Sequence, residues 1–166
     1  EPLRVQALIE TPAGLARAGE IAAASARVEA LILGYADLGA ALGRTRAGAA
    51  DLDGWRPAQE ALLLAARAAG VQAIDGPYLG VAADEGFRAA AARARDAGFD
   101  GKWAIHPSQV EPLNELFTPS DEELERARAV IEALDGAGRG AVALDGEMLD
   151  EAVRVAALRT LARAGE

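Results

Sequence analysis

The chain has 166 residues, 17 of them basic and 26 acidic, which gives a formal net charge of −9, and it contains no cysteine. This length is that of one domain or part of one, and a hydrophobic content of 51% can build a substantial core. No apolar run approaches the roughly 20 residues that cross a bilayer, so we expect no membrane partner. The acidic balance argues against nucleic acid as a partner, because sequence-independent affinity for phosphates comes from clustered Lys and Arg. The lack of cysteine excludes disulfides, zinc-thiolate sites and thiol catalysis, and it is compatible with the reducing cytosol, where we expect the protein.

The chain opens at Glu1 without a Met or a charged-then-apolar leader, as expected of a trimmed chain rather than a targeted one.

Four short apolar runs alternate with segments of helical period. Buried strands are predicted over residues 3–9, 30–33, 71–74 and 102–105, and helices between them over 13–25, 57–69 and 84–97. Gly70 and Gly98 can end two of these helices, because glycine tolerates the left-handed conformation. The β-α-β-α alternation predicts parallel strands joined by crossover helices.

The pattern changes after residue 105. A short helix to residue 117 precedes Ser120 and Glu123, whose spacing is that of a capping box and predicts a helix ending near residue 134. A Gly-rich turn over 135–140, a β-hairpin edge over 141–146 and a last helix over 149–164 complete the chain. Four β-α units make half of an eight-stranded (β/α)8 barrel, so either another segment completes the sheet or the chain is a smaller open sheet. Unpaired strand edges would invite association, and the start of the chain directly in a strand favours the first account.

Polar residues follow each predicted strand, which is where ligands bind in parallel β/α folds. They are Glu10, Asp37, Asp75 and His106. The three carboxylates would converge at one edge of the sheet, where hard oxygen ligands are what Mg²⁺ prefers.

Each of these residues also has a structural interpretation. Glu10 precedes Thr11 and Pro12, a predicted N-cap and first helical residue, so its charge could favour the helix dipole. Asp37 could cap a helix over residues 38–42, and Asp75 could be a turn residue. His106 could be a packed structural histidine.

Five motifs occur in the order and spacing of one family. They are Val5-Gln6-Ala7-Leu8-Ile9-Glu10-Thr11-Pro12-Ala13-Gly14, Leu33-Gly34-Tyr35-Ala36-Asp37-Leu38, Ala73-Ile74-Asp75-Gly76-Pro77, Gly101-Lys102-Trp103-Ala104-Ile105-His106-Pro107-Ser108-Gln109 and Asp145-Gly146-Glu147-Met148-Leu149-Asp150. With them the chain resembles the citrate lyase β-subunit and malyl-CoA lyase family of Mg²⁺-dependent carbon-carbon lyases. The resemblance covers essentially the whole chain but only the C-terminal half of the family pattern. The family's N-terminal strands, which carry a substrate-binding arginine, have no counterpart here.

The resemblance implies an α/β fold of the (β/α)8 TIM-barrel type. The chain would supply roughly strands 5 to 8 plus a C-terminal helical segment. Residues 1–117 would form the C-terminal half of the barrel, and residues 118–166 a helical or lid segment. A homo-oligomer, trimer or hexamer, is the expected assembly.

The same resemblance implies roles for single residues. Glu10 and Asp37 would be the two protein ligands of Mg²⁺, and Asp150 the catalytic acid/base, reaching into the site of a neighbouring subunit. An acid that favours a helix dipole is the structural alternative for Asp150. Family members often carry another acid shortly after the Asp37 position, where this chain has Ala40-Ala41, which bears on the substrate more than on the metal. The residues implied to line the thioester side of the cleft are Asp75, Gly76, Pro77, Ile105, His106 and Pro107.

The implied reaction cleaves a 3-hydroxy-3-carboxyalkyl thioester, such as a citryl-, malyl- or citramalyl-CoA-like compound, into a 2-oxo acid and an acyl thioester. The thiol carrier could be CoA or an acyl-carrier protein. Two alternatives stay open: a CoA-independent 2-oxo-acid aldolase on the same metal, and a non-catalytic half-barrel fragment or assembly subunit.

Overall fold

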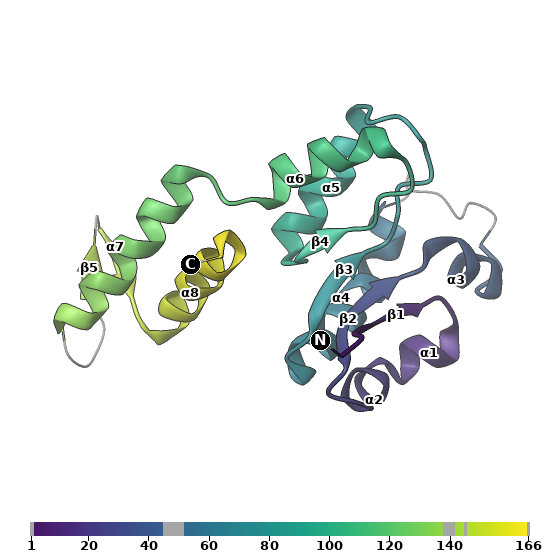
Figure 1. The fold of residues 1–166 in the computed structure, drawn as a ribbon, viewed down its shortest axis with the longest axis horizontal. Helices are drawn as coiled ribbons and strands as arrows, with labels where there is room; N and C mark the ends of the chain where they lie inside the picture. The colour runs from purple at the N-terminus through teal and green to yellow at the C-terminus, as the bar shows by residue number, and fades with distance from the viewer. Residues whose placement is uncertain (1, 45–51, 138–141, 145, 166) are drawn as a thin grey trace. The chain divides into compact units, whose positions relative to one another are not determined.

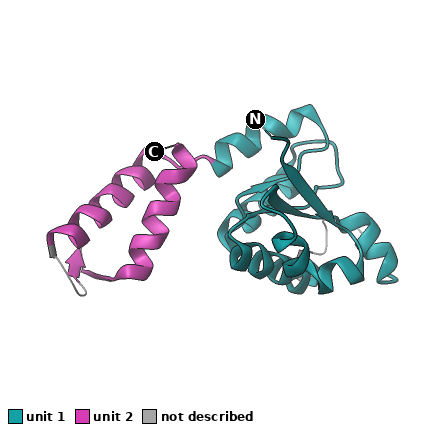
Figure 2. Ribbon diagram, turned by 60° about the horizontal axis from the view of Figure 1, so that its bottom comes forward, with its two compact units in different colours: residues 1–117 teal, residues 118–166 magenta. Residues whose placement is uncertain are grey.

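The computed structural model describes residues 2–44, 52–137, 142–144 and 146–165. They divide into two compact units, Glu1–Phe117 and Thr118–Glu166, which Figure 2 shows in different colours. Within these residues, no helix is both long enough and apolar enough to span a bilayer.

The first unit is built on a four-stranded parallel sheet (Figure 1). Its strands are β1 (Val5–Ile9), β2 (Val28–Leu33), β3 (Gln72–Asp75) and β4 (Gly101–Lys102), and they lie in the sheet in chain order. Ile9 pairs with Leu33 at the end of the first two strands, so the residues that follow β1 and β2 emerge side by side. The predicted β-α alternation and the parallel sheet are confirmed.

Helices connect the strands and cover one side of the sheet. They are α1 (Pro12–Ala16), α2 (Ala18–Ala23), α3 (Tyr35–Ala41), α4 (Leu52–Ala69) and α5 (Glu85–Ala97), followed by the 3₁₀ turn η1 (Pro107–Gln109) and α6 (Val110–Phe117). Gly70 and Gly98, with φ of 69° and 102°, adopt the left-handed conformation predicted for helix ends.

Three elements differ from their predictions. The predicted helix over 13–25 is interrupted at Arg17, whose φ of −117° is not helical. The fourth strand, predicted to reach residue 105, ends at Lys102, because its partner β3 ends at Asp75 and the last ladder bond runs from the Trp103 N–H to the Asp75 carbonyl. The second strand ends at Leu33 as predicted, but it begins at Val28, two residues before the predicted start.

The core of the first unit fills the space between the sheet and its helices. Leu31 and Leu33 of β2 pack with Trp55 and Leu62 of α4, and each of the four is at most 1% exposed. Fully burying a Leu or Phe side chain stabilises the fold by about 1.5–3 kcal/mol. At the edge of the sheet, by contrast, Leu8 of β1 is 37% exposed, so this strand leaves apolar surface uncovered in the described structure.

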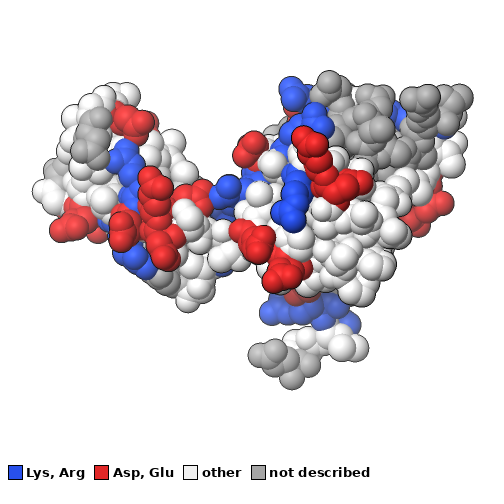
Figure 3. Space-filling model, turned by 90° about the horizontal axis from the view of Figure 1, so that it is seen from above, with Lys and Arg blue, Asp and Glu red and all other residues white. Residues whose placement is uncertain are grey.

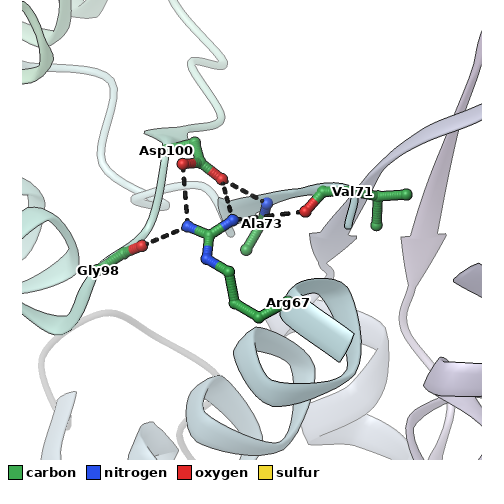
Figure 4. Close-up of polar contacts among 5 residues, drawn as sticks. All are labelled: Arg67, Val71, Ala73, Gly98 and Asp100. Carbon is green, nitrogen blue, oxygen red and sulfur yellow. Dashed lines mark hydrogen bonds and ion pairs between the residues drawn. The ribbon is translucent and has the colours of Figure 1, made fainter. Parts of the chain in front are cut away.

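An arginine clamp closes the amino ends of β3 and β4 (Figure 4). Arg67 of α4 binds both carboxylate oxygens of Asp100, at 2.7 and 2.9 Å, and donates to the Gly98 carbonyl at 2.6 Å. Asp100 in turn accepts the Ala73 N–H at 2.8 Å. A bidentate charged pair of this kind fixes geometry as well as adding stability, so the clamp holds the helix and both strands in register.

The second unit is a helix, a hairpin and a helix: α7 (Asp121–Ala137), β5 (Val142–Leu144), β6 (Glu147–Leu149) and α8 (Glu151–Ala164). The capping box is confirmed: Ser120 Oγ accepts the Glu123 N–H, and Glu123 Oε2 accepts the Ser120 N–H. The turn predicted over 135–140 is wrong for residues 135–137, because α7 continues to Ala137. Positions 138–140 lie outside the described residues. Val130, Leu134 and other apolar side chains form a separate small core here.

Charged side chains of both signs are interspersed on the face shown in Figure 3. In the second unit, Arg126 pairs with Glu147 at 2.6 Å and Arg154 with Asp135 at 2.7 Å. Exposed pairs contribute only about 0.2–1 kcal/mol each, so the apolar core carries most of the stability of this unit.

Candidate functional site

Glu10 lies at the carboxyl end of β1, half-buried, just before α1. The predicted cap is confirmed one residue later: Thr11 Oγ1 accepts the Gly14 N–H at 3.0 Å, and Pro12 is the first helical residue. Because Thr11 supplies the cap, the Glu10 carboxylate is not required for it.

Asp37 lies in the first turn of α3 and is exposed. It does not cap a helix over 38–42, since that helix already begins at Tyr35 with Gly34 as its N-cap. Gly34 provides no side-chain cap, so an acidic residue in this turn is favourable for the helix dipole.

Gly34 brings the Glu10 side chain against the start of this helix. Its N–H donates to the Ile9 carbonyl at 2.9 Å. A Cβ at Gly34 would lie 2.5 Å from the Glu10 Cβ and 3.3 Å from Glu10 Oε2. Glu10 therefore packs directly on the N-cap of the helix that carries Asp37, and the two carboxylates belong to neighbouring elements at one edge of the sheet.

Two carboxylates at such an edge fit a Mg²⁺ ion. Within the described residues, no three His, Cys, Asp or Glu side chains gather into a larger metal-binding group. Mg²⁺ is usually bound through one or two carboxylates and keeps several positions for water and substrate oxygens. The donor set of Glu10 and Asp37 therefore suits Mg²⁺ better than a metal that needs a full cage of protein ligands.

Asp75, the last residue of β3, is fully buried in a polar network. Its Oδ2 accepts from Lys102 Nζ at 2.6 Å, and its Oδ1 accepts from the Tyr35 hydroxyl and from Gln59 Nε2 at 3.0 Å. Lys102 Nζ also donates to the Gly76 carbonyl at 2.7 Å. The structure thus places the Asp75 carboxylate in the protein interior, where it pairs with a buried cation.

Sequence reasoning missed Lys102, Tyr35 and Gln59 as partners of Asp75. One signal was present: Lys102 is a charged residue inside a short predicted strand, and a buried charge needs a partner. Burial raises the pKa of the Tyr35 phenol far above its ordinary value, the Asp75 carboxylate raises it further, and the hydrogen bond from Gln59 acts in the opposite direction. The phenol therefore stays protonated and serves as a donor to Asp75.

Gly76 and Pro77 are buried beside this network. A Cβ at Gly76 would lie 2.2 Å from the Leu33 carbonyl oxygen and 2.6 Å from the Tyr35 ring, so only glycine fits this approach of β3 to β2. The whole segment from Asp75 to Pro77 is therefore buried.

Ile105, His106 and Pro107, by contrast, are exposed. His106 caps η1: its Nδ1 accepts the Ser108 N–H at 3.2 Å. The buried Gln109 accepts the Ile105 N–H at 3.0 Å and donates to the Gly80 carbonyl at 2.6 Å, which joins the loops after β3 and β4. The histidine has the structural role of a cap, while the segment remains accessible to a ligand.

Asp150 belongs to the second unit, where it is the N-cap of α8. Its Oδ1 accepts the N–H groups of Ala152 and Val153 at 2.9 and 3.2 Å, and its side chain is exposed. The carboxylate therefore has a structural function that any catalytic function must share.

A model of the family described as HpcH/HpaI aldolase/citrate lyase matches residues 1–107, which include Glu10, Asp37, the buried network and the exposed segment after β4. The chain belongs to this family. L-malyl-CoA/β-methylmalyl-CoA lyase of Cereibacter sphaeroides is 39% identical over 168 residues, covering 90% of this chain and 53% of the relative. A (3S)-malyl-CoA thioesterase of the same species is 38% identical, covering 98% of this chain and 57% of the relative.

Solved structures of the family have the same fold. The protein CitE of Mycobacterium tuberculosis, in complex with magnesium, acetoacetate and coenzyme A, matches with a TM-score of 0.81 and 39% identity, over 99% of this chain and 62% of that one. A citrate lyase of Burkholderia xenovorans LB400 matches with a TM-score of 0.82 and 30% identity, over 99% and 54%. The family resemblance read from the sequence is confirmed, and the chain spans about half the length of the curated relatives it matches.

Proposed function

We propose that the natural protein is a Mg²⁺-dependent carbon-carbon lyase that cleaves a 3-hydroxy-3-carboxyalkyl thioester of the malyl-, citramalyl- or citryl-CoA class. The observation that carries the proposal is the packing of Glu10 on Gly34, which places it beside the helix of Asp37. Support comes from a relative named as a malyl-CoA lyase and from a solved relative that contains magnesium, acetoacetate and coenzyme A.

The four strands would be strands 5 to 8 of an eight-stranded barrel. The sequential parallel order of β1 to β4 is the order of a (β/α)8 barrel, and the relatives are about twice as long as this chain. The other half would supply the substrate-binding arginine of the family.

We also propose that the protein is a homo-oligomer and that it is cytoplasmic.

In the proposed site, Glu10 and Asp37 would hold the metal at the carboxyl ends of β1 and β2. When bound, Mg²⁺ supplies Lewis-acid stabilisation of negative charge on substrate oxygens. The bond that breaks joins the hydroxyl-bearing carbon to the carbon next to the thioester carbonyl. The hydroxyl loses its proton to solvent, and the carbon next to the thioester carbonyl gains one proton, for which Asp150 is the proposed donor.

The other predicted residues would act around this centre. Ile105, His106 and Pro107 are exposed and would contact the thioester arm of the substrate. Asp75, Gly76 and Pro77 would shape the same side of the cleft from below the surface, since all three are buried.

A second candidate is hydrolysis of the same thioester, because one relative is named as a malyl-CoA thioesterase. Hydrolysis consumes water and releases a hydroxy acid and a free thiol. Cleavage by a lyase releases a 2-oxo acid and leaves the thioester intact, so the products separate the two candidates. A CoA-independent aldolase would instead cleave a hydroxylated 2-oxo acid that carries no thioester.

The test is an assay of the natural full-length protein with Mg²⁺ and malyl-, citramalyl- and citryl-CoA. We expect a 2-oxo acid, detected as its phenylhydrazone, without free thiol. Glu10→Gln and Asp37→Asn should each lower turnover by about 100-fold or more, whereas Glu20→Gln, which removes an exposed acid in α2, should not. Free thiol as the main product would favour the thioesterase, and no turnover of any thioester would leave the non-catalytic alternative.

A further inference from the structure

We propose that Tyr35, Gln59, Asp75 and Lys102 form a positioning network that fixes the first turn of α3, and with it Asp37, relative to Glu10. None of the four would bind the metal. The inference rests on the proposed metal site and identifies the residues that set its geometry from beneath.

The network joins α3 to the neighbouring strands. Tyr35 is the first residue of α3, two positions before Asp37, and its hydroxyl donates to Asp75 at the end of β3. Gln59 of α4 donates to the same hydroxyl oxygen at 2.7 Å. A helix of seven residues is marginal in water, so its position depends on tertiary anchors. Gly34 gives it no side-chain cap, so the end that carries Asp37 is anchored by the buried side chains of Tyr35 and Leu38, and Tyr35 makes the polar contact.

Lys102 holds the acceptor of this anchor in place. The side chains of Lys102 and Asp75 are both 0% exposed, and Nζ binds Asp75 Oδ2 and the Gly76 carbonyl. The same ammonium lies 5.7 Å from the centre of the Tyr35 ring. The Asp75 carboxylate therefore has three side-chain donors and one preferred orientation, which ties the ends of β3 and β4 to the start of α3.

The choice of charged residues points to positioning rather than to stability. Removing two charges from water costs free energy that their attraction often only offsets, so well-packed apolar residues would commonly stabilise such a site equally well. A fully hydrogen-bonded polar network instead specifies one arrangement of its members. Groups that orient metal ligands without touching the metal typically change metal affinity by about 10- to 100-fold when removed.

The test measures Mg²⁺ affinity by titration calorimetry and the free energy of unfolding in urea without Mg²⁺, in the natural full-length protein. Tyr35→Phe keeps the buried ring and removes only the hydroxyl, and we expect it to weaken Mg²⁺ binding about 10-fold. The double variant Asp75→Asn/Lys102→Met removes both charges together, leaves no unpaired one, and should weaken Mg²⁺ binding at least as much.

The matched control is Arg67→Gln, which breaks a charged cluster at the amino ends of β3 and β4. It should lower the free energy of unfolding and leave Mg²⁺ affinity within about twofold, because its contacts lie away from α3. The proposal is overturned if Asp37→Asn weakens Mg²⁺ binding while Tyr35→Phe and the double variant bind as wild type, or if Arg67→Gln weakens binding equally. If the wild type binds no Mg²⁺, or Asp37→Asn binds it unchanged, the metal site itself fails.

Discussion

Gly34 sets how closely the two proposed metal ligands approach. Gly34→Ala would place a methyl group 2.5 Å from the Glu10 Cβ, so Glu10 has to move. We expect Mg²⁺ affinity to fall about 10-fold or more and the free energy of unfolding to fall by about 1–3 kcal/mol. Calorimetric titration and urea unfolding measure the two effects.

A matched control exists on α2. At Gly19 an added Cβ meets nothing within 4 Å, so Gly19→Ala should raise stability by about 0.4–1 kcal/mol. It should leave Mg²⁺ affinity unchanged. Equal Mg²⁺ affinity in Gly34→Ala and Gly19→Ala would contradict the packing of Glu10 on Gly34.

Tyr35 predicts a pH dependence of stability. Its pKa is raised in the folded state, mainly by burial, so the folded chain holds the phenol proton more tightly than the unfolded chain. The resulting stability is complete below the unfolded pKa of about 10 and is lost as pH rises above it, by about 1.4 kcal/mol per pH unit. Tyr35→Phe has no proton to lose, so its stability deficit against wild type should shrink between about pH 9.5 and 11 in urea unfolding. A constant deficit would contradict the buried phenol.

Single site residues were predictable from the sequence where their immediate neighbours in the chain identify them. Glu10 stands at the end of an apolar run, and the Thr11 cap follows from its neighbours. Asp75 was found as a polar residue after a strand, but its partners Lys102 and Gln59 are 27 and 16 positions away, and local pattern does not encode which distant side chains meet in a core.

At the scale of elements, the clamp of Arg67 predicts a stability effect without a metal effect. Arg67→Ala removes the hydrogen bonds of Arg67 to the Asp100 carboxylate and to the Gly98 carbonyl. The Arg67 side chain is 24% exposed and the Asp100 side chain 15%. The free energy of unfolding should fall by about 2 kcal/mol, measured in urea. Arg67→Lys keeps the charge but not the fork, so it should recover only part of this loss. A change below about 0.5 kcal/mol for Arg67→Ala would contradict the clamp.

The strands were predictable because short apolar runs mark them in the sequence itself. Helix ends were predictable because glycine adopts the left-handed conformation that ends a helix, as at Gly98. The break at Arg17 and the early end of β4 were not, since both depend on the surrounding structure. Trp103 makes the last ladder bond, and beyond it the Gln109 side chain takes the Ile105 N–H that a longer strand would have paired.

At the scale of the whole molecule, the second unit would contribute Asp150 to the site of a neighbouring subunit. Asn caps helices as well as Asp, so Asp150→Asn should keep stability within about 0.5 kcal/mol and lower turnover, whereas Asp150→Ala should also cost about 1 kcal/mol. Mixing Asp150→Asn with Glu10→Ala subunits should restore some activity. In a mixed assembly, the intact Glu10 of one subunit can share a site with the intact Asp150 of the other. No recovery after confirmed subunit exchange would mean that the acid acts within its own chain or is not Asp150.

The central claim is that Glu10 and Asp37 together hold one divalent ion. Anomalous diffraction from Mn²⁺ in crystals of the natural full-length protein tests it most directly, because Mn²⁺ takes the same oxygen ligands as Mg²⁺. The account predicts one Mn²⁺ peak at bonding distance, about 2.1 Å, from a carboxylate oxygen of each residue. A peak bonded to other side chains, or to only one of the two, would contradict it.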